Sequence, residues 1–216
     1  MAFARIANFL SFIFLLMMFL LIIRNSLEAQ IRMFAMQSLV LTALAGVVAY
    51  FGGRGELAGV AVVLAIVKVI VIPSVLYRAA TKIGLQRAVA PYLGPSMSMF
   101  ICALLVVVSF YVMAPVTSSN PLPTADGIPL AFAGVLIGLF TTVNRRRALT
   151  QILGFLMLEN SVFMVALLAT YGVPLIVELG VFLDVLVAVL ILEVFVYRIK
   201  ENFDSMDVKK MGALRG

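Results

Sequence analysis

Long hydrophobic runs separated by short polar or charged segments dominate this chain. Seven runs are each about long enough to cross a bilayer as a helix, which takes about 20 residues. They are residues 6–23, 33–53, 57–77, 96–114, 129–144, 148–170 and 175–197. The connections between them hold the turn formers and most of the charges, as in 115–126 with its three prolines. The pattern predicts an all-α integral membrane protein with seven transmembrane helices.

Composition narrows the function classes. The chain is 64% hydrophobic and 12% charged, whereas a soluble domain is about 45 to 50% apolar and about 25% charged, so a water-soluble globule is excluded. The sequence has no His and a single Cys, Cys102. Zinc, haem or iron–sulfur ligation and a disulfide framework are therefore excluded within this chain. The net charge of +6 is dispersed between apolar runs, which argues against nucleic-acid binding.

The positive charges predict the orientation. With seven spans, alternate connections fall on opposite sides of the membrane. One side holds only Arg5 and Arg54, and Lys68 lies inside a span, so 13 of the 16 Lys and Arg residues lie on the other side. The positive-inside rule therefore places the C-terminus in the cytoplasm and the N-terminus outside.

Five ionisable residues fall inside predicted spans: Lys68, Glu159, Glu178, Asp184 and Glu193. Each costs on the order of 3 kcal/mol near the bilayer centre, so each must face protein or water. At 1.5 Å per residue, Glu159 lies about 11 residues into its span, Lys68 about 12 and Asp184 about 10, all near the midplane. We therefore expect two carboxyl groups and one amine on three helices to share one plane.

The other polar positions have weaker expectations. Glu178 is nearer the outer surface than Asp184 and is a candidate outer branch of a proton path. Glu193 lies on the face of the same helix opposite Asp184. We expect Gln37 and Glu193 to support the row of polar groups across these helices, which we call the polar axis. The alternative to a role in proton transfer is a purely structural ion pair between Lys68 and Glu159 or Asp184. Pro73 cannot donate to the carbonyl of the residue four positions earlier, which leaves a polar backbone group beside Lys68.

A separate motif predicts a close helix contact. Gly134 and Gly138 are four residues apart in the fifth span. Small residues at this spacing let the backbones of two membrane helices approach closely.

Five segments carry a resemblance to a known family. They are MQSLVL (36–41), VKVIVIP (67–73), QILGFLMLEN (151–160), VELGVFLD (177–184) and FDSMDVKKMGALRG (203–216). They resemble the E component of hydrogenase-4 and of related formate hydrogenlyase-like, group 4 membrane-bound hydrogenase complexes. The likeness covers nearly the whole chain.

The last three spans are also similar to the K subunit of respiratory complex I and to the C subunit of Mrp-type antiporters. In those families two acids in consecutive helices lie on a central polar axis. By resemblance Glu159 takes the place of the first acid and Asp184 that of the second. The resemblance divides the chain into an N-terminal four-helix region (1–126), a three-helix region (127–200) and a cytoplasmic tail (201–216).

The resemblance implies a non-catalytic multi-pass subunit of an oxidoreductase complex in the cell (inner) membrane. The proton-transfer residues would be Glu159, Asp184, Lys68 and Glu178. No cofactor is expected in this chain, and the [NiFe] centre and iron–sulfur clusters would belong to partner subunits. The implied partners are antiporter-like and other small membrane subunits, a hydrophilic hydrogenase arm and membrane lipid. The alternatives are a C-type subunit of a cation/proton antiporter and a structural scaffold.

Overall fold

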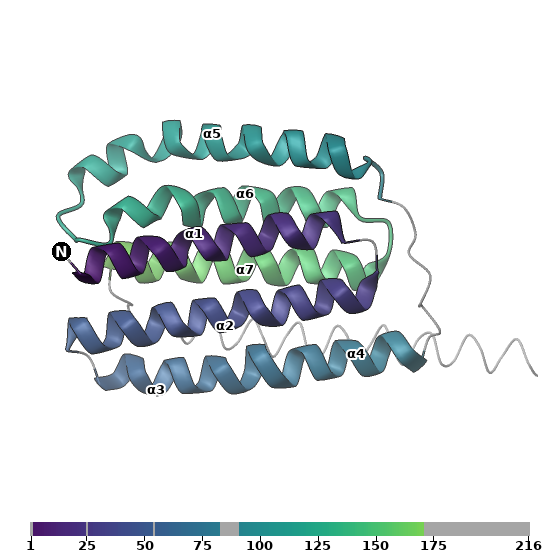
Figure 1. Ribbon diagram of the computed structural model, residues 1–216, viewed down its shortest axis with the longest axis horizontal. Helices are drawn as coiled ribbons and strands as arrows, with labels where there is room; N and C mark the ends of the chain where they lie inside the picture. The colour runs from purple at the N-terminus through teal and green to yellow at the C-terminus, as the bar shows by residue number, and fades with distance from the viewer. Residues whose placement is uncertain (1, 25, 54, 83–90, 171–216) are drawn as a thin grey trace, which may run out of the picture.

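The computed structural model describes residues 2–24, 26–53, 55–82 and 91–170, which form helices joined by short connections (Figure 1). Among these residues, six helices are long and apolar enough to span a membrane. The predicted seventh span (175–197) and tail (201–216) lie outside the described residues, as do Glu178, Asp184 and Glu193. The first six predicted spans are therefore confirmed as helices long and apolar enough to cross a membrane.

The helices follow the predicted runs in order. The α-helices are α1 (Ala2–Ile23), α2 (Leu27–Gly52), α3 (Gly55–Leu64), α4 (Ile72–Lys82), α5 (Pro95–Ser119), α6 (Ile128–Asn144) and α7 (Ala148–Thr170). A π-helix, η1 (Ala65–Val71), joins α3 to α4, and a 3₁₀ turn, η2 (Ala125–Gly127), precedes α6. Thus α3, η1 and α4 together form one span.

Several helices extend beyond their predicted hydrophobic runs, among them α2 and α5. Helix α2 begins at Leu27 rather than at residue 33, because the Ser26 hydroxyl accepts a hydrogen bond from the Ala29 N–H at 3.4 Å and caps the first turn. Helix α5 continues through Pro115 to Ser119. Hydropathy underestimates such ends, since a helix continues into the polar interface where charged and hydroxyl side chains are solvated.

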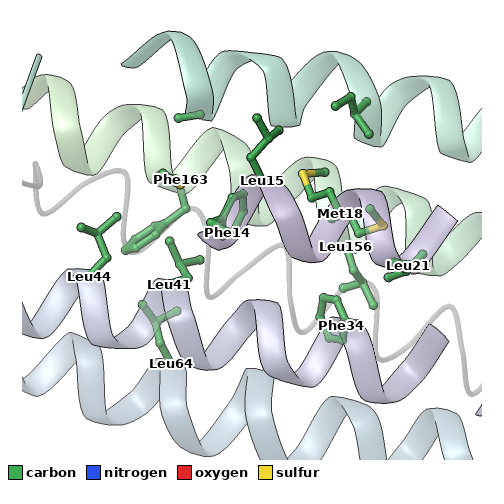
Figure 2. Packing of buried hydrophobic residues seen from close by; sticks show 14 of the residues in the cluster. Phe14, Leu15, Met18, Leu21, Phe34, Leu41, Leu44, Leu64, Leu156 and Phe163 are labelled. Carbon is green, nitrogen blue, oxygen red and sulfur yellow. The ribbon is translucent and has the colours of Figure 1, made fainter. Parts of the chain in front are cut away.

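The helices lie side by side with roughly parallel axes (Figure 1). Helix α1 packs against α2 and α6, α6 pairs with α7, and α2 contacts both α7 and the α3–η1–α4 span. Figure 2 shows the apolar core between α1, α2 and α7, to which Phe14, Phe34, Leu41, Leu156 and Phe163 contribute. The central position of α2 brings residues of the third span close to α7.

Helices α6 and α7 approach so closely that glycine is required at the contact. A Cβ on Gly138 would lie 2.6 Å from the backbone nitrogen of Leu158, and one on Gly134 would lie 2.6 Å from the Ser161 hydroxyl oxygen. On α7, a Cβ at Gly154 would lie 2.6 Å from the backbone nitrogen of Thr142. The close contact predicted for the two glycines of α6 is confirmed.

The connections rich in arginine lie at one end of the bundle. The end of α1, the start of α2, the end of α4 and the α6–α7 turn all lie there (Figure 1). Arg145 in the α6–α7 turn is buried, and its Nη2 donates to the Ile22 carbonyl at 3.2 Å. Burial lowers the pKa of its guanidinium. Successive spans run in opposite directions, so their connections lie at alternate ends of the bundle, as the predicted spans require. The assignment of this end to the cytoplasm stays a prediction.

Candidate functional site

A buried ion pair lies at the middle of the bundle. The Lys68 Nζ donates to Glu159 Oε1 over 2.7 Å, and only 2% of the lysine and 5% of the glutamate are exposed. Glu159 is the central residue of α7, and Lys68 lies near the middle of the Leu57–Thr81 span. The structure therefore brings together two of the residues that the sequence predicts at one depth.

Two uncharged residues complete a polar cluster around this pair. Lys68 Nζ also donates to Asn160 Oδ1 over 2.9 Å, and Asn160 Nδ2 donates to the Ser38 hydroxyl oxygen over 3.1 Å. Both side chains are buried. Because the amide oxygen faces the ammonium, the amide nitrogen is left to face Ser38. The cluster of Lys68, Glu159, Asn160 and Ser38 therefore joins η1, α7 and α2 through hydrogen bonds.

Lys68 occupies a π-helical segment. In η1 the Ile72 N–H bonds to the Val67 carbonyl, a longer ring than in an α-helix. Pro73 follows directly, and its missing N–H disturbs the regular pattern at the same place. The Ser74 hydroxyl donates to the Ile70 carbonyl at 2.6 Å, which satisfies one backbone acceptor near the proline. A π segment holds an extra residue in its turn, so it changes the direction in which Lys68 points relative to a regular helix.

Gln37 lies next to the cluster but does not bond to it. It directly precedes Ser38 on α2 and is completely buried. Within the described part of the chain, neither its Nε2 nor its Oε1 has a hydrogen-bond partner. The structure thus places Gln37 at the depth of the ion pair, and its predicted supporting role on the polar axis stays a prediction.

Asn160 and Ser38 are members of the cluster that the sequence did not predict. Each is a polar residue directly adjacent in sequence to a predicted one, Glu159 and Gln37. Neighbouring polar side chains in an otherwise apolar span are the signal that points to them. Uncharged polar groups are common at membrane helix contacts, which is why composition alone gives them little weight.

The cluster can hold and exchange a proton between two groups. In one state the amine is an ammonium and the acid a carboxylate, and in the other both are neutral. The 2.7 Å hydrogen bond connects the two states directly. Because both forms have the same net charge, the exchange moves a dipole without placing an uncompensated charge in the bilayer. Among the described residues, no group of three or more His, Cys, Asp or Glu could hold a metal ion.

Comparisons with known proteins give full-length matches. The chain is 36% identical over 197 residues to an uncharacterized protein of Mycobacterium tuberculosis, Rv0085, covering 91% of this chain and 90% of that protein. It is 28% identical over 217 residues to hydrogenase-4 component E of Escherichia coli K12 and of Shigella flexneri, covering 99% of each chain. No protein-family model matches the chain. No solved structure matches it either.

Proposed function

Because the chain belongs to the family that includes hydrogenase-4 component E, we propose that it is a non-catalytic membrane subunit of a multisubunit [NiFe] hydrogenase or formate hydrogenlyase-like complex. Its mid-membrane charged residues would carry protons laterally and couple the redox reaction to ion movement. Metal centres and clusters would belong to partner subunits. The complex would lie in the cell (inner) membrane.

The single observation that carries this proposal is the buried Lys68–Glu159 pair at mid-membrane. A charge at this depth is costly, and an apolar pair of similar volume would hold the helices at least as well. Ionisable residues inside a membrane bundle are therefore retained for proton or ion movement more often than for stability. The hydrogen bonds from Lys68 through Asn160 to Ser38 hold the lysine against α7 and α2. The Lys68–Glu159 bond joins titratable groups of two helices at one depth, which supports lateral transfer.

The proposed step uses groups of this chain only. A proton on Lys68 Nζ crosses the 2.7 Å bond to Glu159 Oε1 and leaves a neutral amine beside a carboxylic acid. A second proton arriving at the amine restores the ammonium, and the acid then releases its proton to the next group along the axis. Asp184 is the proposed next acceptor and Glu178 a proposed outer branch. Both belong to the segment outside the described residues.

The test replaces both charges together, because removing one alone leaves its partner buried and uncompensated, at a cost of about 3–5 kcal/mol. In the Lys68→Met/Glu159→Gln variant of the assembled complex, we expect hydrogenase turnover to continue while protons translocated per turnover fall at least tenfold. Inverted membrane vesicles with a pH-sensitive dye give the proton flux, and a redox assay gives the turnover. Asp126→Asn, an exposed carboxylate outside the cluster, serves as the matched control.

Other outcomes favour the alternatives. An assembled double variant with the wild-type proton yield would contradict the relay. Loss of the complex in both the double variant and Glu159→Gln would favour a scaffold, in which the pair holds helices together. Co-purification separates the antiporter alternative, since an assembly without a nickel-bearing subunit would place the chain in a cation/proton antiporter.

A further inference from the structure

A second feature lies away from the ion pair, between α2 and α4. A cavity of about 420 Å³ opens there. Three of its lining residues are apolar, Ile31, Ala35 and Pro73, and we call them its apolar floor. Arg32, Arg78 and Tyr77 also line it. Neither Lys68 nor Glu159 lines it, so it is distinct from the proposed proton-transfer cluster.

The cavity lies at the expected boundary between hydrocarbon and headgroups. Arg78 follows Lys68 by ten residues, or about 15 Å along the helix, which is half the thickness of the hydrocarbon core. Arg32 precedes Ser38 by six residues, about 9 Å, and its long side chain reaches further toward the surface. The two guanidiniums therefore approach one interface from two helices. Tyr77, which is 49% exposed, is a residue type typical of that level.

Among the described residues that line the cavity, positive charges outnumber negative ones. The lining holds two arginines and one acid, Glu28. In the described residues neither Arg32 nor Arg78 forms an ion pair with a carboxylate, and both are exposed. A guanidinium presents a planar fork of donors that matches phosphate oxygens in a bidentate way. Two such forks above an apolar floor suit an amphiphile with a phosphate head.

We propose that this cavity binds an anionic phospholipid, with its phosphate between Arg32 and Arg78 and an acyl chain along the apolar floor. Basic cavities between membrane helices on the cytoplasmic side are a known way of holding anionic headgroups. The positive-inside pattern predicts that this end of the bundle faces the cytoplasm. The apolar floor distinguishes the site from one for free phosphate, which would gain nothing from Ile31, Ala35 and Pro73.

Such a lipid would act on the span that carries the ion pair. It would bridge α2 and α4, and Pro73 in its floor is the second residue of α4, two positions after the π segment that holds Lys68. The lipid proposal rests only on the cavity and the charges of its lining residues. It therefore does not depend on the proposed proton transfer through Glu159.

The test measures lipid binding to the full-length chain in neutral detergent by native mass spectrometry. The probes are cardiolipin, phosphatidylglycerol, phosphatidylcholine and inorganic phosphate. We expect the two anionic lipids to bind at least tenfold more tightly than phosphatidylcholine. Inorganic phosphate at equal concentration should not displace them. Equal binding of phosphatidylcholine, or displacement of the lipid by inorganic phosphate alone, would overturn the proposal.

Variants locate the site. Arg32→Gln/Arg78→Gln should weaken binding of the anionic lipid at least tenfold. Arg5→Gln/Arg24→Gln removes the same net charge from exposed arginines outside the cavity and should change it less than twofold. Equal losses in the two double variants would overturn the proposal, because binding would then depend on net charge alone.

A third variant covers the case in which the arginine variant does not fold. Ala35→Trp keeps both arginines but fills the apolar floor, and should also weaken lipid binding tenfold. Unchanged binding in this variant would contradict a lipid seated in the cavity.

Discussion

Asn160 joins the two charged groups to a third helix. Its amide oxygen accepts from the Lys68 ammonium at 2.9 Å and its amide nitrogen donates to Ser38 at 3.1 Å. An ammonium has three protons to donate and is costly to leave short of acceptors in a dry interior. Asn160 therefore supplies an acceptor that Glu159 alone does not, and it aligns Lys68 with α2 as well as with α7.

The first residue-level prediction concerns this amide. Asn160→Leu keeps the volume but removes the acceptor, so we expect a loss of about 2–3 kcal/mol in the free energy of unfolding, as for a hydrogen bond to a charged group. Ser38→Ala removes only the acceptor of a neutral amide, for which about 1 kcal/mol is expected. Unfolding of the full-length chain in mixed detergent micelles measures both. A leucine variant no less stable than the alanine variant would contradict this ranking.

The depth of a charged residue in the membrane can be predicted from the sequence, but its partner cannot. Lys68 and Glu159 are identified by their cost in hydrocarbon, and the rise per residue of a helix places them at one depth from sequence position alone. Depth does not specify rotation about the helix axis, so it leaves open which acid lies opposite the lysine. The structure places Glu159 there, at 2.7 Å.

At the scale of helices, the α6–α7 contact depends on the absence of side chains. A Cβ at Gly138 or at Gly154 would come within 2.6 Å of backbone nitrogen on the facing helix. Backbone cannot move aside as a flexible side chain can, so the helices would have to separate. This contact positions Glu159, which lies on α7 one residue beyond Leu158, the neighbour of Gly138.

We therefore predict opposite effects of alanine at different glycines. Gly138→Ala and Gly154→Ala should each lower the free energy of unfolding by about 1–3 kcal/mol through overpacking. Gly46→Ala on α2, where a Cβ meets nothing within 4 Å, should be neutral or raise it by up to about 1 kcal/mol, because alanine favours the helix. Thermal unfolding of the three variants in detergent checks this. Similar losses at all three positions would mean that helix propensity, and not the close contact, governs them.

The local sequence of the third span predicts a helix with a defect but does not predict the form of the defect. Its hydrophobic run predicts a helix, and Pro73 predicts a defect near Lys68. The defect takes the form of a π segment at Ala65–Val71, which begins well before the proline. Lys68 on this segment meets Glu159 and Asn160 of α7, and the proline by itself specifies neither the type nor the start of the defect.

At the scale of the whole molecule, the arginine-rich connections gather at one end. This arrangement makes the predicted orientation testable with a membrane-impermeant maleimide. In a Cys102→Ala background, Ser119→Cys at the end of α5 and Ala148→Cys at the start of α7 place exposed thiols at opposite ends of the bundle. We expect intact cells to label the first at least tenfold more than the second, and inverted vesicles to show the reverse. Equal labelling from both sides, or the opposite preference, would overturn the predicted orientation.

The sequence by itself determined the protein class, the six described spans and the shared depth of Lys68 and Glu159, because bilayer thickness and the cost of buried charge act on each segment separately. The tertiary structure decided the pairing of Lys68 with Glu159, the addition of Asn160 and Ser38, and the cavity between Arg32 and Arg78. These features depend on the rotation of each helix about its axis and on which helices are neighbours. Packing between distant segments sets both, and no local pattern encodes them.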